Sequence, residues 1–280
     1  MKYSTKSLLL WIFSVIFTFA IAYYQRTTGP TYPVKGKVNI TGQEIKYKLI
    51  RTDTTSEISD SSEIKIEVPN KNITGRYIYK RYKSFDEWTH ADLLRKDDFL
   101  IAYIPRQPMA GKIEYQILLK SDNKIIKLTE EPVVMRYKGS VPTFILIPHV
   151  LLMFLAMMFS TRTGLEVLIK GKNIFKYTVV TLLLLIPGGM ILGPIVQKFA
   201  FDVFWAGWPF GTDLTDNKTA IAFLAWIIAF FVIMKNKEKR KGFVLAASII
   251  LLIVYLVPHS LFGSEIDHTK TKSDKVEIVK

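Results

Sequence analysis

The chain of 280 residues contains no cysteine. This absence excludes disulfide bonds, thiolate metal sites, cysteine nucleophiles and haem attached through paired cysteines. An exported domain must then be held together by its own hydrophobic core, which a segment of about 115 residues can supply. Histidine is also scarce, with four residues in the whole chain, so few imidazoles are available for a metal or haem site.

The long polar segment, residues 25–140, lacks the usual catalytic signatures. It contains no glycine-flanked nucleophilic serine, no phosphate-binding loop and no cluster of histidines. His90 stands among Asp86, Glu87 and Asp92, and is interpreted as a solvent-facing side chain. The segment therefore favours a binding or accessory role over an enzymatic one.

Acidic residues are in the minority, 24 against 38 lysines and arginines, which gives a formal net charge of +14. An excess of this kind is typical of proteins that bind nucleic acid. Nucleic acid is nevertheless excluded as a partner, because much of the excess lies in short loops between apolar stretches and an exported domain meets no genome. The basic residues of the exported domain are expected to face anionic lipid headgroups.

Apolar stretches occupy both ends of the chain, at residues 8–24, 141–160, 177–193, 219–234 and 243–262. A helix needs about 20 residues to cross a bilayer, so the last four stretches predict a transmembrane bundle of four helices. The first stretch is either an uncleaved anchor or a signal peptide, since Lys2 and Lys6 precede it and small residues occur near its end. Its length and bulky aromatic residues favour the anchor.

Basic loops predict the orientation of the helices. Residues 162–176 and 235–241 carry most of the short-loop lysines and arginines, and the positive-inside rule places both loops and the N-terminus in the cytoplasm. Residues 25–140 and the tail 263–280 are then predicted to lie in the periplasm. The cysteine-free composition, rich in lysine, isoleucine and asparagine, favours a bacterial inner membrane.

Period-two alternation is frequent between residues 34 and 138, for example at Ile64, Ile66 and Val68. Seven or eight such runs, separated by turn residues, predict an all-β, immunoglobulin-like sandwich domain inserted before the bundle. Residues 84–97 interrupt the pattern and are expected to form a helical turn that crosses one edge of the sandwich.

Two histidines stand out in the apolar stretches. His149 follows Pro148 and His259 follows Pro258, and both are predicted at the outer ends of their helices, at similar depth. Paired imidazoles of this kind can ligate a b-type haem or a divalent cation. The competing interpretation is that each histidine bonds a backbone carbonyl freed by its proline and holds no ligand.

The outer loop before the fourth stretch of the bundle is rich in aromatic and acidic residues. Its tryptophans suit the headgroup level of a membrane, and Asp213 or Thr215 is expected to cap the following helix. Asp213, Asp216 and Asn217 are candidate ligands of a divalent metal ion, or partners of His149 and His259 in one outer polar pocket. The sequence Pro187-Gly188-Gly189 predicts either a kink or a broken helix in the stretch 177–193.

The run Arg26-Thr27-Thr28-Gly29-Pro30-Thr31-Tyr32-Pro33, the loop 209–218 and the overall layout resemble uncharacterised bacterial inner-membrane proteins. The resemblance implies a location and an architecture, and no mechanism. The sequence thus predicts a domain order of anchor (1–24), periplasmic β-domain (25–140), bundle (141–262) and polar tail (263–280). Its expected function is that of an accessory subunit which binds the lipid bilayer and an envelope protein, and the alternative is a membrane redox protein.

Overall fold

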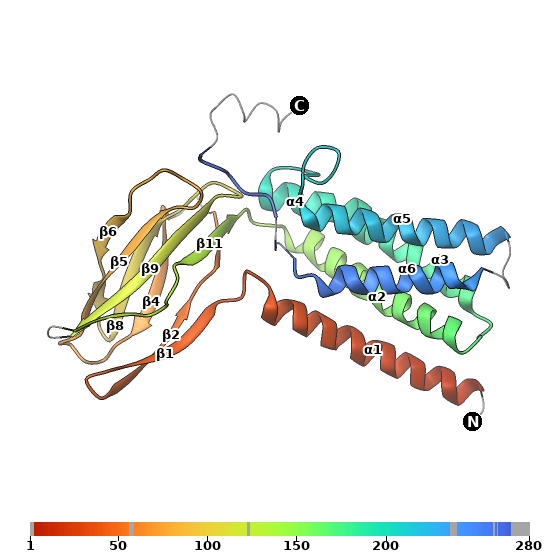
Figure 1. Cartoon of the computed structure of the whole chain (residues 1–280), viewed down its shortest axis with the longest axis horizontal. Helices are drawn as coiled ribbons and strands as arrows, with labels where there is room; N and C mark the ends of the chain where they lie inside the picture. Colours follow the sequence, from red (N-terminus) through yellow and green to blue (C-terminus); the bar gives the residue numbers. More distant parts are fainter. Residues whose placement is uncertain are drawn as a thin grey trace. The chain divides into compact units, whose positions relative to one another are not determined.

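The structure, a computed structural model, describes residues 3–55, 59–121, 124–235, 240–259, 261 and 263–269. The chain divides into two compact units. A helical unit comprises Met1–Pro30 and Val141–Gly263, and a β unit comprises Thr31–Ser140 and Ser264–Lys280. Figure 1 shows the ribbon of both units, coloured along the sequence.

The helical unit contains six α-helices and one π-helical segment among its described residues. Their bounds are α1 Tyr3–Thr28, α2 Thr143–Leu168, α3 Ile174–Leu185, η1 Ile186–Leu192, α4 Gly193–Phe201, α5 Leu214–Lys235 and α6 Lys241–Leu256. Since α3, η1 and α4 form one continuous span, four spans in the described chain are long and apolar enough to cross a membrane: Tyr3–Thr28, Thr143–Leu168, Ile174–Phe201 and Leu214–Lys235.

The Pro187-Gly188-Gly189 sequence neither breaks nor ends its helix. A seven-residue π-helical segment carries the chain through it, and the helix continues to Phe201. The glycines allow close contact with neighbouring helices, because a Cβ on Gly188 would lie 2.9 Å from the Leu152 Cβ of α2. The expected end of this helix at Gly193 is therefore wrong, since Gly193 begins α4.

The last apolar helix is shorter than its apolar stretch. α6 has 16 residues and ends at Leu256, although the hydrophobic sequence extends to residue 262. Val257 takes an extended backbone (ψ 116°) ahead of Pro258, as expected for a residue that precedes proline. The helix alone spans about 24 Å at 1.5 Å per residue, somewhat less than the hydrocarbon core of a bilayer.

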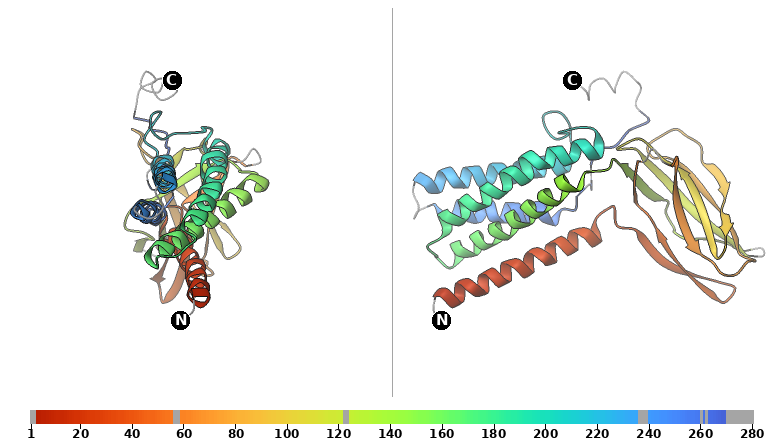
Figure 2. Two further views of the ribbon diagram at one scale, coloured as in Figure 1. Left: turned by 90° about the vertical axis from the view of Figure 1, so that its right-hand side faces the viewer. Right: turned by 180° about the vertical axis from the view of Figure 1, so that it is seen from behind.

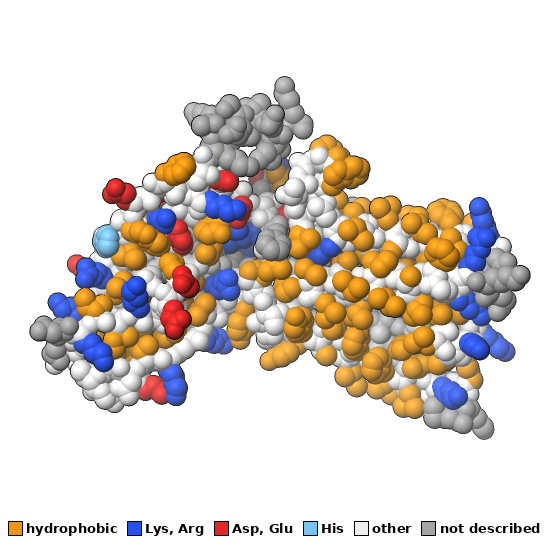
Figure 3. All heavy atoms as spheres, in the orientation of Figure 1, with side chains coloured by type: hydrophobic (Ala, Val, Ile, Leu, Met, Phe, Trp, Pro, Cys, Tyr) orange, Lys and Arg blue, Asp and Glu red, His pale blue; other side chains and the backbone are white. Residues whose placement is uncertain are grey.

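Inside the helical unit, small residues and a single tryptophan form much of the core. Trp226 of α5 is fully buried together with Ala156 and Met157 of α2 and Val244 and Ala247 of α6. The views in Figures 1 and 2 both show α1 running beside α2, which it contacts. Hydrophobic side chains cover most of the visible surface of this unit in Figure 3, as lipid contact requires.

The β unit contains eleven strands among its described residues. Their bounds are β1 Val34–Ile40, β2 Gln43–Leu49, β3 Thr52–Thr54, β4 Ser61–Glu67, β5 Thr74–Arg81, β6 Thr89–Asp92, β7 Leu94–Lys96, β8 Phe99–Pro105, β9 Lys112–Ser121, β10 Lys124–Lys127 and β11 Val133–Lys138. Ile64, Ile66 and Val68 are buried while the intervening charged residues are exposed, which confirms the predicted alternation.

These strands form three sheets around one core. The orders are β1-β2, β3-β11-β9-β5-β6 with β10 added to β9, and β4-β8-β7. All neighbouring strands pair antiparallel except β3, which runs parallel to β11. Buried side chains from all three sheets, including Leu49, Ile104 and Tyr115, belong to a single hydrophobic cluster.

The helical turn expected in the segment 84–97 is wrong, because this segment forms two short strands. It forms β6, which pairs with β5, and β7, which pairs with β8 in another sheet. Leu93 lies between them, buried, and its N–H donates to the Gly75 carbonyl. Short edge strands with few buried side chains leave little periodicity in the sequence, so the pattern missed both.

The segment after α6 returns to the β unit. Ile266 N–H donates to the Ala110 carbonyl (3.3 Å) and His268 N–H to the Lys83 carbonyl (2.9 Å), and the Arg136 guanidinium donates to the Ser264 carbonyl. Glu265 accepts from the ammonium groups of both Lys83 and Lys112. The described part of the predicted polar tail is therefore packed against this unit.

Candidate functional site

His149 is positioned by the turn of η1. The imidazole lies one residue after Pro148 in α2, and its Nδ1 donates to the Gly188 carbonyl at 2.9 Å. Because that carbonyl is an acceptor, Nδ1 carries the proton and Nε2 keeps its lone pair. This matches the interpretation in which a backbone carbonyl accepts a hydrogen bond from the histidine. It also leaves the second ring nitrogen, Nε2, able to bind a ligand.

His259 lies in the turn after α6, immediately beyond Pro258. Three other ionisable groups are close enough to act on it electrostatically: Lys218, His149 and Asp213. The structure thus brings both predicted histidines to the same end of the bundle, and adds a cation and a carboxylate.

Lys218 is the residue of this group that the sequence did not single out. It lies in α5, its exposed fraction is 5%, and its Nζ donates to the Val257 carbonyl at 2.6 Å. A buried lysine in an apolar helix is rare and faces the bundle interior. Lys218 comes one residue before the predicted stretch 219–234, where a charged residue is ordinary, so the sequence gave no clear signal for it.

Asp216 organises the loop between α4 and α5. One carboxylate oxygen, Oδ2, accepts from Gln197 Nε2 (3.0 Å), Ala206 N–H (2.6 Å) and Gly207 N–H (3.0 Å). Only glycine fits at position 207, because a Cβ there would lie 2.7 Å from the Asp216 Cβ. A carboxylate with three donors is a structural clamp for the loop.

The other two candidate metal ligands are also engaged. Asp213 Oδ1 accepts from Thr215 N–H at 2.8 Å, as a capping residue does, and Asn217 Oδ1 accepts from Trp208 N–H at 2.6 Å. Within the ranges that the structure describes, no group of three or more histidine, aspartate or glutamate side chains is arranged to hold a metal ion. The three loop residues are neighbours, and their oxygens point to separate backbone donors.

A second polar centre lies at the opposite end of the bundle, where α1 begins. The Arg162 guanidinium and the Glu166 carboxylate of α2 form an ion pair at 2.7 Å, and both side chains are fully buried. The Tyr3 hydroxyl donates to Glu166 Oε1 (2.6 Å) and Arg162 donates to Ser7 Oγ (3.1 Å), so α1 supplies part of the polar environment. The sequence predicted a basic cytoplasmic loop that begins at Arg162, whereas Arg162 lies within α2.

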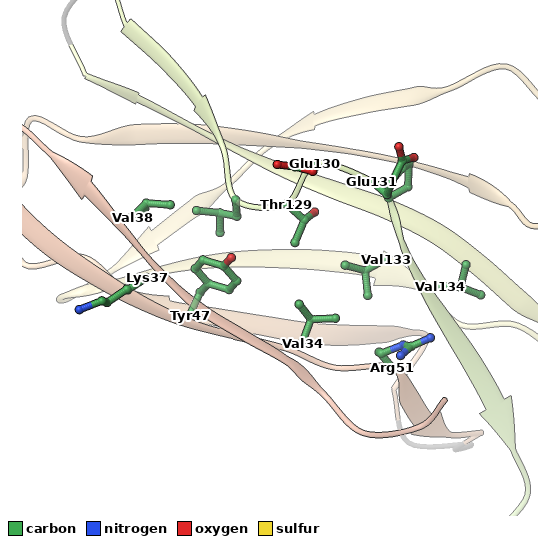
Figure 4. Close-up of a pocket in the computed structure, with 12 residues that line it drawn as sticks. Val34, Lys37, Val38, Tyr47, Arg51, Thr129, Glu130, Glu131, Val133 and Val134 are labelled. Atoms are coloured by element: carbon green, nitrogen blue, oxygen red, sulfur yellow. The ribbon is translucent and has the colours of Figure 1, made fainter. Parts of the chain in front are cut away.

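A groove of 630 Å³ opens on the β unit (Figure 4). One wall is the β1–β2 hairpin, with Val34, Val38 and Tyr47, and the other is the turn between β10 and β11 with the first residues of β11. The Tyr47 ring lies over Gly36, where a Cβ would be 2.2 Å from the Tyr47 hydroxyl oxygen, so the glycine lets this ring lie flat on β1.

The rims of the groove carry opposite charges. Lys37 and Arg51 lie on the hairpin side, and Glu130 and Glu131 lie on the side of β11. Between them, the buried Thr129 hydroxyl has no hydrogen-bond partner among the described residues. An open groove with a partly apolar floor and two charged rims is suited to binding an elongated, amphipathic ligand.

No family model, no curated protein and no solved structure matches this chain. Three sites of the structure bear on function: the histidine site, the buried ion pair and the groove.

Proposed function

We propose that this protein is a non-enzymatic accessory subunit of a bacterial envelope complex, which presents its β unit in the periplasm to bind another envelope protein. The observation that carries the proposal is the solvent-open groove of the β unit. The outer loop, in contrast, uses Asp213, Asp216 and Asn217 to bond its own backbone.

The strand order supports an immunoglobulin-like sandwich for this unit. The orders β11-β9-β5-β6 and β4-β8-β7 correspond to the G-F-C-C′ and B-E-D sheets of that architecture. Sandwiches of this class commonly serve as binding modules on cell surfaces, which agrees with an interaction role.

Chain connectivity supports a transmembrane topology with an even number of crossings after the β unit. Residues 31–140 and the segment Ser264–Thr269 bond to each other, so they lie on one side of the membrane. The spans of α2, of α3 to α4, and of α5 make three crossings, and α6 must make the fourth. Its shortness is accommodated by local thinning of the bilayer at modest cost.

Charge supports the orientation. Exposed basic side chains gather at the end of the helical unit where α1 begins, as Figure 3 shows. They include Lys6, Lys170, Lys172, Lys176, Lys235 and Arg240. The positive-inside rule puts this end in the cytoplasm and the β unit outside.

In vivo photo-crosslinking of the full chain tests the proposed function. Photo-reactive residues are placed at the exposed β-unit positions Phe85, Leu94 and Ile125. We expect one envelope protein to be trapped from at least one position and identified by mass spectrometry. The absence of any protein adduct from all three positions, combined with steady turnover of a substrate by the purified protein, would refute it.

A second candidate function, a b-type haem or metal-binding redox protein, is favoured by one observation. His149 donates Nδ1–H to a backbone carbonyl, which is the usual orientation of a ligating histidine, and His259 lies within electrostatic range. Where the two rings hold iron, the haem would supply electron transfer. The buried Lys218 weighs against this candidate, because its positive charge repels a metal cation.

An absorption spectrum distinguishes the two candidates. Detergent-purified protein from haem-replete cells would show a Soret band that His149→Ala removes, if the redox function is correct. A colourless preparation without bound metal would eliminate it.

A further inference from the structure

One edge of β11 is only partly covered. β3 pairs with β11 along Arg136, Tyr137 and Lys138, and within the described chain no strand pairs with that side of β11 ahead of Arg136. The first half of β11 pairs with β9 on its other side, from Val133 to Arg136. An edge of this kind can accept an additional strand.

The alternating direction of the backbone hydrogen bonds along β11 shows which N–H and C=O groups face the open side. Tyr137 N–H points to the β9 side, where it donates to the Gly111 carbonyl, and Arg136 N–H points to the opposite side, where it donates to the Arg51 carbonyl. Because successive residues alternate in a strand, Val134 directs its N–H and C=O to the same side as Arg136. Val134 also lines the groove.

The floor of the groove suits the side chains of an added strand. Val34, Val38 and Val133 are apolar, and Tyr47 offers an aromatic face between them. A strand places every second side chain on one face, so alternating apolar residues would fill this floor.

The rims favour a ligand that carries both signs of charge. Glu130 and Glu131 attract a basic group at one side, and Arg51 attracts an acidic group at the other, where Lys37 is already paired with Glu44 at 2.8 Å. A polypeptide with mixed charges meets this requirement, and its backbone also matches the donor and acceptor at Val134. A fatty acyl chain or an apolar small molecule would leave the outward N–H and C=O of Val134 unpaired.

We propose that the groove binds an extended peptide segment of a partner protein, which adds as a strand to the β11 edge at Val134. The proposal rests on the proposed interaction function and specifies its mode: alternating apolar residues face Val34, Tyr47 and Val133, and charged residues meet the two rims.

The test begins with the full chain in living cells. A photo-reactive phenylalanine derivative replaces Tyr47 in the groove, and in a matched control it replaces Tyr79, a half-buried tyrosine of β5 outside the groove. We expect a protein adduct from position 47 and none from position 79, with the crosslink mapped to a segment that alternates apolar and polar residues.

The mapped segment is then synthesised and its affinity for the detergent-purified full chain is measured. Methylating the peptide amides on alternate residues distinguishes the two edges of the bound strand. Methylation of the amides that face β11 should weaken binding about tenfold, and methylation of the amides on the other edge should leave binding unchanged. In the protein, Val134→Pro removes the outward N–H and should weaken binding about tenfold. Val134→Thr keeps the N–H and the branched shape, and should bind normally.

Each outcome decides between the proposals. If position 47 yields no protein adduct while Phe85, Leu94 or Ile125 does, the accessory function stands and strand addition fails. If methylation of either set of amides has the same effect, or a lipid or small molecule is trapped at position 47, strand addition is also refuted. Amide methylation needs no change in the protein, so this readout survives if Val134→Pro does not fold.

Discussion

Arg162 and Glu166 form an ion pair at 2.7 Å one helical turn apart in α2, with neither side chain exposed. The aromatic rings of Trp11 and Tyr177 lie 5.5 Å and 5.0 Å from the guanidinium, so both charges are enclosed by three helices. Burying two charges is costly unless further hydrogen bonds satisfy them. Tyr3, Ser7 and the N–H of Asn173 supply such bonds.

Removal of one partner of this pair should destabilise the protein strongly. We expect Arg162→Met or Glu166→Gln to lower the free energy of unfolding by about 3–5 kcal/mol, because a buried charge is left uncompensated. The double variant should recover part of the loss. Denaturant unfolding in detergent measures all three, with the exposed Lys170→Met as control. A single variant as stable as the control would contradict the buried pair.

Alanine should be tolerated at Gly193, the first residue of α4, and not at Gly188 in the π-helical segment η1. Gly188→Ala would place a Cβ 2.9 Å from the Leu152 Cβ, whereas at Gly193 the nearest atoms are 3.8 Å away. We expect Gly188→Ala to lower stability by about 1–3 kcal/mol through overpacking. Gly193→Ala should be neutral or stabilising, because alanine favours helix. Thermal unfolding of the two variants side by side checks this order.

The loop between α4 and α5 should depend on the charge of Asp216. Asp216→Asn keeps the shape and replaces a carboxylate that accepts three hydrogen bonds, so we expect a local loss of about 1.5–3 kcal/mol. Faster amide exchange at Ala206 and Gly207 would report it. The exposed Asp202, which pairs with Lys198, offers a control in Asp202→Asn. Equal exchange in both variants would show that Asp216 does not hold the loop.

Attachment of the segment after α6 should depend on pH through Glu265. Burial opposes ionisation of Glu265, yet the ammonium groups of Lys112 and Lys83 outweigh it and lower the pKa of this carboxyl. A depressed folded pKa contributes stability above the unfolded value of about 4.3 and loses it as the pH falls through the folded value. Amide exchange at Ile266 and His268 should therefore accelerate below about pH 4. Glu265→Gln should abolish that acceleration, and an unchanged pH profile in this variant would exclude Glu265 as its origin.

The absence of native cysteine makes the topology directly testable. Single variants Lys127→Cys in β10 and Thr269→Cys after α6 should react with a membrane-impermeant maleimide in spheroplasts. Lys170→Cys and Arg240→Cys should react only after the membrane is permeabilised. Labelling of position 269 on the side opposite to position 127 would show that α6 does not cross.

The sequence predicted the strands in which apolar and polar residues alternate, and it missed the strands too short to show this alternation. The eight expected strand runs overlap observed strands, and several of them alternate buried with more exposed side chains, as β4 does at Ile64 and Ile66. β3, β6 and β7 have three or four residues each, too few to show alternation. The continuation of the helix through Pro187 was also hidden, since a π turn depends on contacts with α2.

For the candidate site, the sequence located His149, His259 and the acidic loop, because polar residues in apolar stretches are conspicuous. It did not indicate Lys218 or the Arg162–Glu166 pair, which lie at the ends of spans where charged residues are ordinary. It also gave no sign of the groove, whose walls come from residues 34–51 and 128–134.

By itself, the amino-acid sequence determined that the chain has membrane-spanning helices and an inserted β-rich segment, because hydrophobic length and alternation are local properties. Tertiary structure alone decided that Asp216 clamps a loop, that Glu265 returns to the β unit, and that Val134 lies on an open edge. These depend on contacts between residues far apart in the chain, which no local pattern encodes.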